Sequence, residues 1–357
     1  MLVSNNHACR VRNRLQVAWR SMEVLSMVSL HALIGSWCRW SLVLLVALGL
    51  STAVAQRQYT LRISTVIGQG DPLYDGYVRF AEAVEERTDG GIRVQVFGDA
   101  QLGQDEDVME QALLGVDVAF NTDAGRLGVR IPEMGIVLAP YVFDDTAQAN
   151  EFLASEIWQG WVDRLEEEHG LTVLALNYYV GARHFVTKKP ILAPTDLRGL
   201  RIRTPGAPVW QETIRALGAT PVALPWIETY PAMQQGVVDG AEAQHPGSFG
   251  LGLHEIATDI SKTGHILLMN GPVVGTTWLR TLPEEYQLIL REEAFKAGEW
   301  TTARVLEMES EFEALMAAAG VTVHEVDVAP FREAAQSMYA VVGLSEVKTQ
   351  VDAFFNR

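Results

Sequence analysis

The sequence predicts an α/β protein with two domains, and three observations support this. The chain has 357 residues, enough for two domains with sizeable cores. Residues 199–244 alternate between strand and helix in the manner of a βαβ unit. A helical pattern runs from Pro283 to Ala319. Its roughly 36 residues would measure about 54 Å, more than the width of one domain, so we expect this helix to run along both.

The amino terminus predicts a secretory signal peptide over residues 1–55. Its beginning is basic, the stretch from Trp40 to Leu50 is mostly apolar, and Ala53-Val54-Ala55 has the pattern of a cleavage site. The alternative is a membrane anchor, but the apolar stretch is shorter than the roughly 20 residues that a spanning helix needs. We therefore expect the chain to be exported. The long basic lead-in predicts that translation starts at Met22 or Met27.

Composition restricts the chemistry and the partners of the exported chain. Both cysteines, Cys9 and Cys38, lie in the predicted signal peptide, which leaves no disulfide, cysteine nucleophile or zinc–cysteine site. Five basic residues and one acidic residue also lie there, so 23 basic and 43 acidic residues remain, a net charge of −20. This charge argues against nucleic acid and anionic membrane surfaces as partners. An anionic ligand stays possible, because salt screens the field beyond a Debye length of about 8 Å.

Strands and helices alternate through the first half of the chain. The hydrophobic pattern predicts strands at 60–66, 92–97, 116–121 and 171–176, and helices at 73–87, 105–114 and 146–168. A dinucleotide-binding interpretation of Gly68-Gln69-Gly70 fails, because Leu73 stands where the third glycine of G-x-G-x-x-G belongs. Asp105-Glu106-Asp107 looks like a metal cluster, but acids at a helix start complement the helix dipole. We interpret this group as capping and predict no metal site.

Arg203 is the most informative residue of the 199–244 segment. The predicted strand Leu200–Arg203 ends in Ile-Arg-Thr-Pro-Gly, and ligands of open α/β sheets collect outside the carboxyl ends of strands. A guanidinium matches a carboxylate through two parallel hydrogen bonds, which lysine cannot make. The alternative is a strand-end arginine paired with a nearby acid. A helix at 204–217 and a strand, helix and strand at 220–242 complete the segment.

The sequence resembles the solute-binding proteins of tripartite ATP-independent periplasmic (TRAP) transporters, the DctP-like family. The resemblance covers nearly the whole chain beyond residue 58, in the family's order. The matching motifs are Gln101-Leu102-Gly103, Pro140-Tyr141-Val142-Phe143, Gly181-Ala182-Arg183-His184-Phe185, G-L-R-I-R-T-P-G at 199–206, Ala216-Leu217-Gly218-Ala219 with Pro221, Pro225-Trp226-x-Glu228-x-Tyr230, and Gln235-Gly236-Val237-Val238-Asp239-Gly240.

The resemblance implies a periplasmic binding protein of two lobes, each a mixed β-sheet flanked by helices. Such a protein captures an organic acid between its lobes and delivers it to a membrane permease, without catalysis or a cofactor. We expect lobe I to comprise 56–180 and 269–300, and lobe II 181–268 and 301–357. The long helix would span both lobes and bend on closure, with Gly298 as the weak point.

The resemblance also implies ligand contacts. Arg203 would clamp the ligand carboxylate. Arg183, where the chain crosses between lobes, would supply a second cationic contact, or it would be a hinge arginine that bonds backbone carbonyls. Trp226 would lie flat against the carbon skeleton of the ligand, or it would be a core tryptophan.

One departure from the family pattern leaves the ligand open. Many members have a ligand-binding asparagine where this chain has Ala243, so Gln244 or His245 is expected to make that polar contact. The other expected contacts are Tyr179, Asp105 and Gln69. Arg203 and Arg183 together would allow a dicarboxylate, whereas Trp226 and Tyr179 would allow a monocarboxylate.

The last part of the chain predicts two strands at 265–269 and 273–277, the long helix, a strand at 321–326 and a helix at 330–342. Two other functional classes compete. An ABC-type or sensory binding protein would share the cleft but not the I-R-x-P and Q-G-V-V-D-G motifs. An exported hydrolase lacks support, because Gly247-Ser248-Phe249-Gly250 has the wrong spacing for a nucleophile elbow, and His254-Glu255 lacks the second histidine of a zincin.

Overall fold

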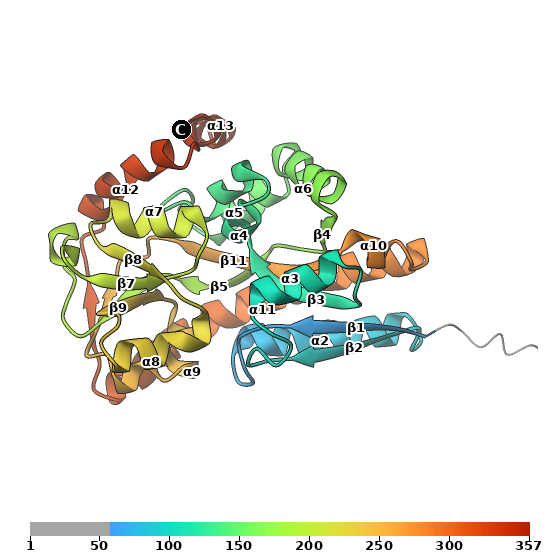
Figure 1. Ribbon diagram of the computed structural model, residues 1–357, viewed down its shortest axis with the longest axis horizontal. Coiled ribbons are helices and arrows are strands. Elements are labelled where there is room, and N and C mark those ends of the chain that lie inside the picture. Colours follow the sequence, from blue (N-terminus) through green and yellow to red (C-terminus); the bar gives the residue numbers. More distant parts are fainter. Residues whose placement is uncertain (1–57) are drawn as a thin grey trace, which may run out of the picture. The chain divides into compact units, whose positions relative to one another are not determined.

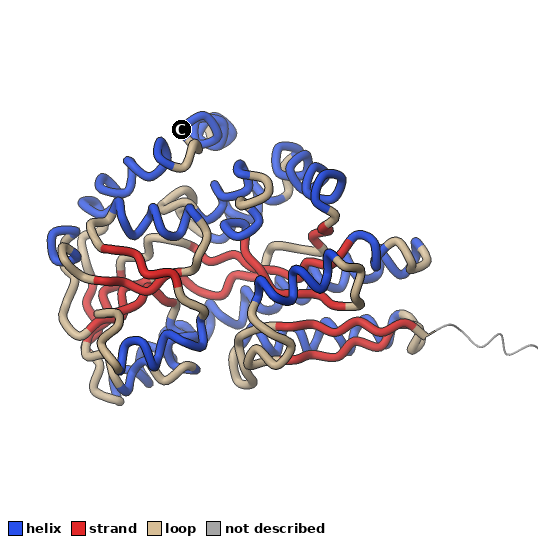
Figure 2. Tube along the Cα trace, in the orientation of Figure 1, coloured by secondary structure: helices blue, strands red, loops and turns tan. Residues whose placement is uncertain are grey.

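The computed structural model describes residues 58–357, so the predicted signal peptide lies outside the described residues. Those residues form an α/β structure with two mixed six-stranded sheets, each flanked by helices (Figures 1 and 2). Within this range, the structure contains no helix that combines the length and the apolar character needed to cross a bilayer.

The first sheet has the strand order β2-β1-β3-β11-β4, and β5 also pairs with β11. Strands β2, β1 and β3 run parallel, and β11 runs antiparallel to β3, β4 and β5. The bounds are β1 Tyr59–Ser64, β2 Ile92–Phe97, β3 Val118–Asp123, β4 Leu171–Val173, β5 Tyr178–Ala182 and β11 Leu267–Gly275. All six residues of β3 are buried, so Asp123, at the carboxyl end of the strand, lies in the interior.

The second sheet has the order β12-β10-β6-β9-β7-β8. Its strands are β6 His184–Thr187, β7 Arg201–Thr204, β8 Thr220–Ala223, β9 Gly240–Ala243, β10 Asp259–Lys262 and β12 Thr322–Glu325. Strand β7 lies between β8 and β9 and is parallel to both, which confirms the predicted βαβ alternation. Arg203 lies near the carboxyl end of β7, as predicted.

The chain passes from the first sheet to the second at Arg183, between β5 and β6, as predicted. It returns between β10 and β11 and crosses again through α11. The helices are α2 Pro72–Arg87, α3 Asp105–Leu113, α4 Ala124–Leu127, α5 Thr146–Leu153, α6 Glu156–His169, α7 Pro208–Ala216, α8 Thr229–Gln234, α9 His245–Gly250, α10 Thr276–Leu279, α11 Glu284–Ala318, α12 Ala329–Val341 and α13 Ser345–Phe354, with 3₁₀ turns η1 Pro132–Leu138, η2 Pro194–Leu197, η3 Trp226–Glu228 and η4 Leu253–Glu255.

Helix α11 has 35 residues and follows Pro283, which confirms the predicted long helix. It packs on α2, β5 and β11 of the first lobe and on α9 and β12 of the second (Figure 1). At Gly298 the side chain of Asn177 approaches so closely that an added Cβ would lie 2.1 Å from Asn177 Oδ1. Glycine is therefore required there by packing.

The prediction was wrong in three parts of the chain. The predicted helix 146–168 is two helices, because Ser155 begins α6 by accepting a hydrogen bond from the Trp158 N–H at 3.2 Å. The two predicted strands at 265–277 form the single strand β11, in which Gly271 allows a close approach to the Ala175 carbonyl. Helix α13 was missed; its end packs Phe354 edge-on against Phe152, with ring centroids 5.8 Å apart.

Candidate functional site

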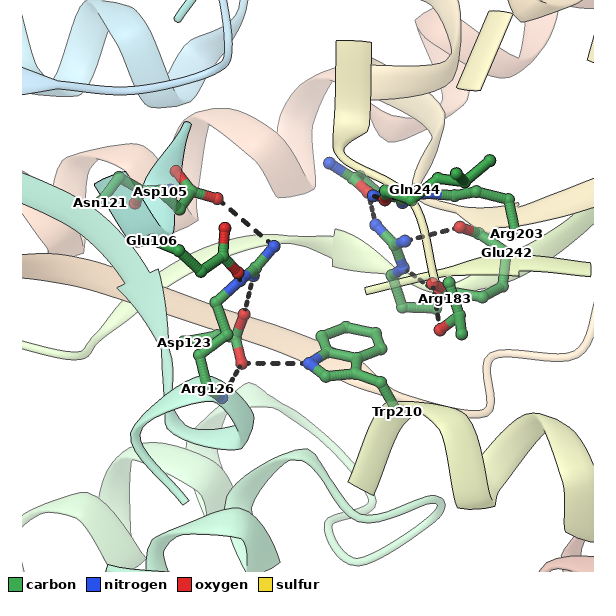
Figure 3. Close-up of polar contacts among 12 residues, drawn as sticks. Asp105, Glu106, Asn121, Asp123, Arg126, Arg183, Arg203, Trp210, Glu242 and Gln244 are labelled. Atoms are coloured by element: carbon green, nitrogen blue, oxygen red, sulfur yellow. Dashed lines mark hydrogen bonds and ion pairs between the residues drawn. The ribbon is translucent and has the colours of Figure 1, made fainter. Parts of the chain in front are cut away.

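A small cavity of about 50 Å³ lies between the carboxyl ends of strands from the two sheets. Its polar lining from the first lobe is Asp105, Asn121, Asp123, Arg126 and Asn270, and from the second lobe Arg183, Arg203 and Gln244, with Trp210 and Trp226. Two wider pockets of about 470 and 400 Å³ adjoin it, and Trp226 lines all three. Figure 3 shows the polar groups of the two lobes facing each other.

Arg203 is buried without an acidic partner. Its side chain is among the largest fully buried ones, with the residue only 1% exposed. Nε and Nη2 donate to the Leu224 carbonyl at 3.0 and 2.8 Å, and the guanidinium carbon lies 5.2 Å from the ring centroid of Trp226. Among residues 58–357, no carboxylate comes within the 4.0 Å of an ion pair with it. Burial lowers the pKa of Arg203 to about 9, and Glu242 opposes this effect.

Arg183, in contrast, is fully engaged by the protein. Nε donates to Glu242 Oε2 at 2.5 Å, Nη1 donates to Gln244 Oε1, and Nη2 donates to the Glu242 carbonyl at 2.6 Å. Both members of this ion pair are buried, and the Thr204 hydroxyl donates to the other carboxylate oxygen of Glu242 at 3.2 Å. Arg183 therefore lines the cavity as a neutralised group, closer to the predicted hinge arginine than to a second clamp.

The first-lobe wall of the cavity is built around Arg126, which the sequence analysis did not identify. Arg126 follows β3 in α4 and forms ion pairs with Asp123, with Asp105 at 3.3 Å and with Glu106 at 3.5 Å. Asp123 Oδ1 also accepts a hydrogen bond from Trp210 Nε1 at 3.1 Å, which joins β3 of the first lobe to α7 of the second (Figure 3).

Asp105 and Asp107 have different roles. Asp107 accepts from the Gln104 backbone N–H at 3.2 Å and so caps α3, as predicted for this acidic group. Asp105 turns instead toward the cavity that it lines. Burial raises the pKa of its carboxyl to about 6, although Arg126 acts in the opposite direction. Among the described residues, no group of three or more His, Cys, Asp or Glu is arranged to hold a metal ion.

Only some of the other predicted contact residues line the cavity. Gln244 and Trp226 line the cavity. Tyr179 does not line it; its hydroxyl donates to Glu309 Oε1 on α11 at 3.0 Å. Gln69 is exposed and lines the wider pocket of about 470 Å³. His245 is buried at the start of α9, with Nε2 3.7 Å from Glu313 Oε2.

Comparison with known proteins gives concordant matches. The family model described as "Bacterial extracellular solute-binding protein, family 7" (DctP) matches residues 63–344. The sialic acid-binding periplasmic protein SiaP of Vibrio cholerae is 27% identical over 281 residues, which are 78% of this chain and 87% of that protein.

Two solved TRAP periplasmic solute-binding proteins each cover 83% of this chain and 99% of their own. The one from Escherichia fergusonii, an apo open structure, is 39% identical with a TM-score of 0.74. The one from Ochrobacterium anthropi, with bound L-fuconate, is 30% identical with a TM-score of 0.81.

Proposed function

Because this chain belongs to family 7 of the bacterial extracellular solute-binding proteins, we propose that it captures an organic acid on Arg203 and delivers it to a membrane permease. The family consists of solute-binding transporter components, not enzymes. SiaP and the fuconate-bound structure are named for acidic ligands, which supports an acid as the ligand here. Periplasmic location, export through residues 1–55 and the permease partner belong to this proposal.

The observation that carries the proposal is the uncompensated charge of Arg203. A buried cation without a paired anion is unfavourable, because burial removes its hydration. A ligand carboxylate would restore the missing interaction through charge-assisted hydrogen bonds. Arg203 Nη1 donates no hydrogen bond that the described residues account for, so it is available to such a ligand.

Closure of the lobes completes the binding step. The carboxylate docks on Arg203 in the second lobe, and the lobes then approach and exclude water, which strengthens the ion pair. Trp210 Nε1 donates to Asp123 across the lobes and so stabilises the closed arrangement. No covalent bond is formed or broken, and the closed form presents both lobes to the permease.

The experiment is calorimetric titration of the purified protein and its Arg203→Lys variant with a panel of organic acids. Lysine keeps the charge but loses the planar fork of donors, so affinity should fall more than about tenfold, or about 1.4 kcal/mol. The matched control is Arg201→Lys, because Arg201 lies on the same strand but is exposed and paired with Asp239. Equal affinity in Arg203→Lys and in the unmodified protein would refute the assignment of Arg203.

A further inference from the structure

The cavity offers one uncompensated positive charge, on the side of the second lobe. Arg183 is neutralised by Glu242. Arg203 has no ion-pair partner within 4.0 Å among residues 58–357, and it is 1% exposed. One carboxylate would therefore satisfy this wall of the cavity, and a second would find no free cation beside it.

The opposite wall is negative. Two carboxylates that line the cavity, Asp105 and Asp123, share the single guanidinium of Arg126. Glu106, more exposed than either, lies 3.5 Å from the same guanidinium. A second acidic group on a ligand that reached across from Arg203 would meet an excess of negative charge, and like charges at this range repel strongly in a desolvated site.

The same wall needs a hydrogen-bond donor. Asn270 on β11 is 6% exposed and lines the cavity, and its Oδ1 has no hydrogen-bond partner within the protein part described. A buried acceptor without a partner loses its hydration without compensation. An alkyl chain would leave Asn270 and Asp105 unsatisfied. A hydroxyl donates to these oxygens and also accepts from Arg126.

We propose that the site selects monocarboxylates whose far end carries hydroxyl groups, and that Asp105 is the residue that rejects a second acidic group. The inference rests on the proposed function, because it takes the first carboxylate to be bound by Arg203. Hydroxylated monocarboxylates are accepted at both walls, whereas dicarboxylates and unsubstituted alkanoates each fail at the Asp105 wall.

The charge of Asp105 makes this selectivity depend on pH. The groups that face Asp105 are Arg126, Glu106, Asp123 and, across the cavity, Arg203. Its carboxyl has a pKa raised to about 6, with burial as the main cause, so it is ionised at pH 7.5 and mostly protonated at pH 5. A protonated Asp105 no longer repels a second carboxylate. Discrimination against dicarboxylates should therefore weaken as the pH falls from 7.5 to 5.

Calorimetric titration of the purified protein tests the inference. The probes are D-gluconate, D-galactonate, D-glucuronate and D-galacturonate, the matched dicarboxylates glucarate and galactarate, and hexanoate and succinate. At pH 7.5, a hydroxylated monocarboxylate should bind at least about tenfold more tightly than its matched dicarboxylate. In Asp105→Asn this ratio should shrink by at least about tenfold. Glu110→Gln, an exposed acid on the same helix, should leave the ratio unchanged.

The outcomes separate the inference from the proposed function. The inference is overturned, with the function intact, if the tightest ligand is a dicarboxylate or an alkanoate. It is also overturned if the unmodified protein discriminates equally at pH 5 and pH 7.5, a comparison that needs no variant to fold. If none of the acids binds, both the inference and the proposed organic-acid function fail.

Discussion

Arg203 and Arg183 line the same cavity, yet their guanidinium groups have opposite surroundings. Every guanidinium nitrogen of Arg183 donates to Glu242 or Gln244, whereas the guanidinium hydrogen bonds of Arg203 all go to one backbone carbonyl. Both arginines lie beside β9, which carries Glu242, but only Arg183 forms an ion pair with its carboxylate. The sequence predicted a carboxylate clamp at Arg203 and left Arg183 between a second contact and a hinge arginine, and the structure gives the two guanidinium groups different partners.

Removing the acid of the buried pair should reveal this difference. Glu242→Gln keeps the shape but leaves the charge of Arg183 uncompensated, and breaking a buried ion pair costs about 3 kcal/mol or more. We expect the free energy of unfolding, measured with urea, to fall by about that amount. Asp239→Asn breaks the exposed pair with Arg201 and should cost less than about 1 kcal/mol. Similar losses in the two variants would contradict the assigned roles.

At the scale of elements, the long helix α11 is fastened to β5 by a few polar contacts. Asn177 Nδ2 donates to the Phe295 carbonyl at 2.9 Å, and the Thr302 hydroxyl donates to the Asn177 carbonyl at 2.9 Å. Gly298 lies between these contacts, where a side chain would displace Asn177. The predicted bend at Gly298 stays a prediction, while the packing gives a separate reason for glycine.

Gly298→Ala should therefore destabilise the protein, although alanine is the better helix former by about 1 kcal/mol. The added Cβ would lie 2.1 Å from Asn177 Oδ1 and force that side chain from its hydrogen bond. Gly160→Ala is the matched control, because Gly160 lies within α6 and an added Cβ there meets nothing within 4 Å. We expect the melting temperature to fall in the first variant and to rise or stay constant in the second. A rise in both would refute the packing argument.

The elements that the sequence predicted well have local signals at their ends. Asp71 and Pro72 begin α2, and Pro283 precedes α11. The errors at 265–277 and at α13 depend on distant packing, such as Gly271 against Ala175. In the site, too, a residue with a local signal was predicted and a contact between distant residues was not. Arg203 stands at a strand end and was predicted, whereas the Asp123–Trp210 contact joins residues 87 positions apart and has no local signal.

At the scale of the whole molecule, three buried histidines gather where the chain passes between the lobes. The rings of His184 and His245 lie 4.7 Å apart, and His265 stacks on Phe185 at 5.0 Å. Burial is the main cause of the lowered pKa of all three side chains. It holds the pKa of His184 well below its usual range and lowers the pKa of His245 to about 4 and that of His265 to about 3. All three are therefore neutral in the folded protein at neutral pH.

Stability should fall as the pH drops from about 6.5 toward 4. In that window the unfolded chain binds protons at these histidines and the folded protein does not, so each destabilises by up to about 1.4 kcal/mol per pH unit. Asp71 and Asp105, whose pKa values burial raises to about 6, act oppositely below pH 6, because the folded state holds their protons more tightly. We expect the histidines to dominate, because three histidines oppose two carboxyl groups and their effect begins at the higher pH.

Urea unfolding of His265→Asn between pH 7 and pH 5 measures one such contribution. The variant should lose less stability over that range than the unmodified protein, by about 1.4 kcal/mol per pH unit below 6.5. If the free energy of unfolding of His265→Asn falls with pH as steeply as that of the unmodified protein, burial of a neutral His265 does not destabilise the protein at low pH.

The hydrogen bond from Trp210 to Asp123 has an optical consequence. Trp210 and Trp226 each have a guanidinium 5.2 Å from their rings, one from Arg183 and one from Arg203. When the lobes part, the indole of Trp210 exchanges a buried carboxylate for water, and the emission of an indole depends on just such surroundings. The protein thus carries its own fluorophore at the place where closure occurs, and an unlabelled titration followed by tryptophan emission should report each capture event directly.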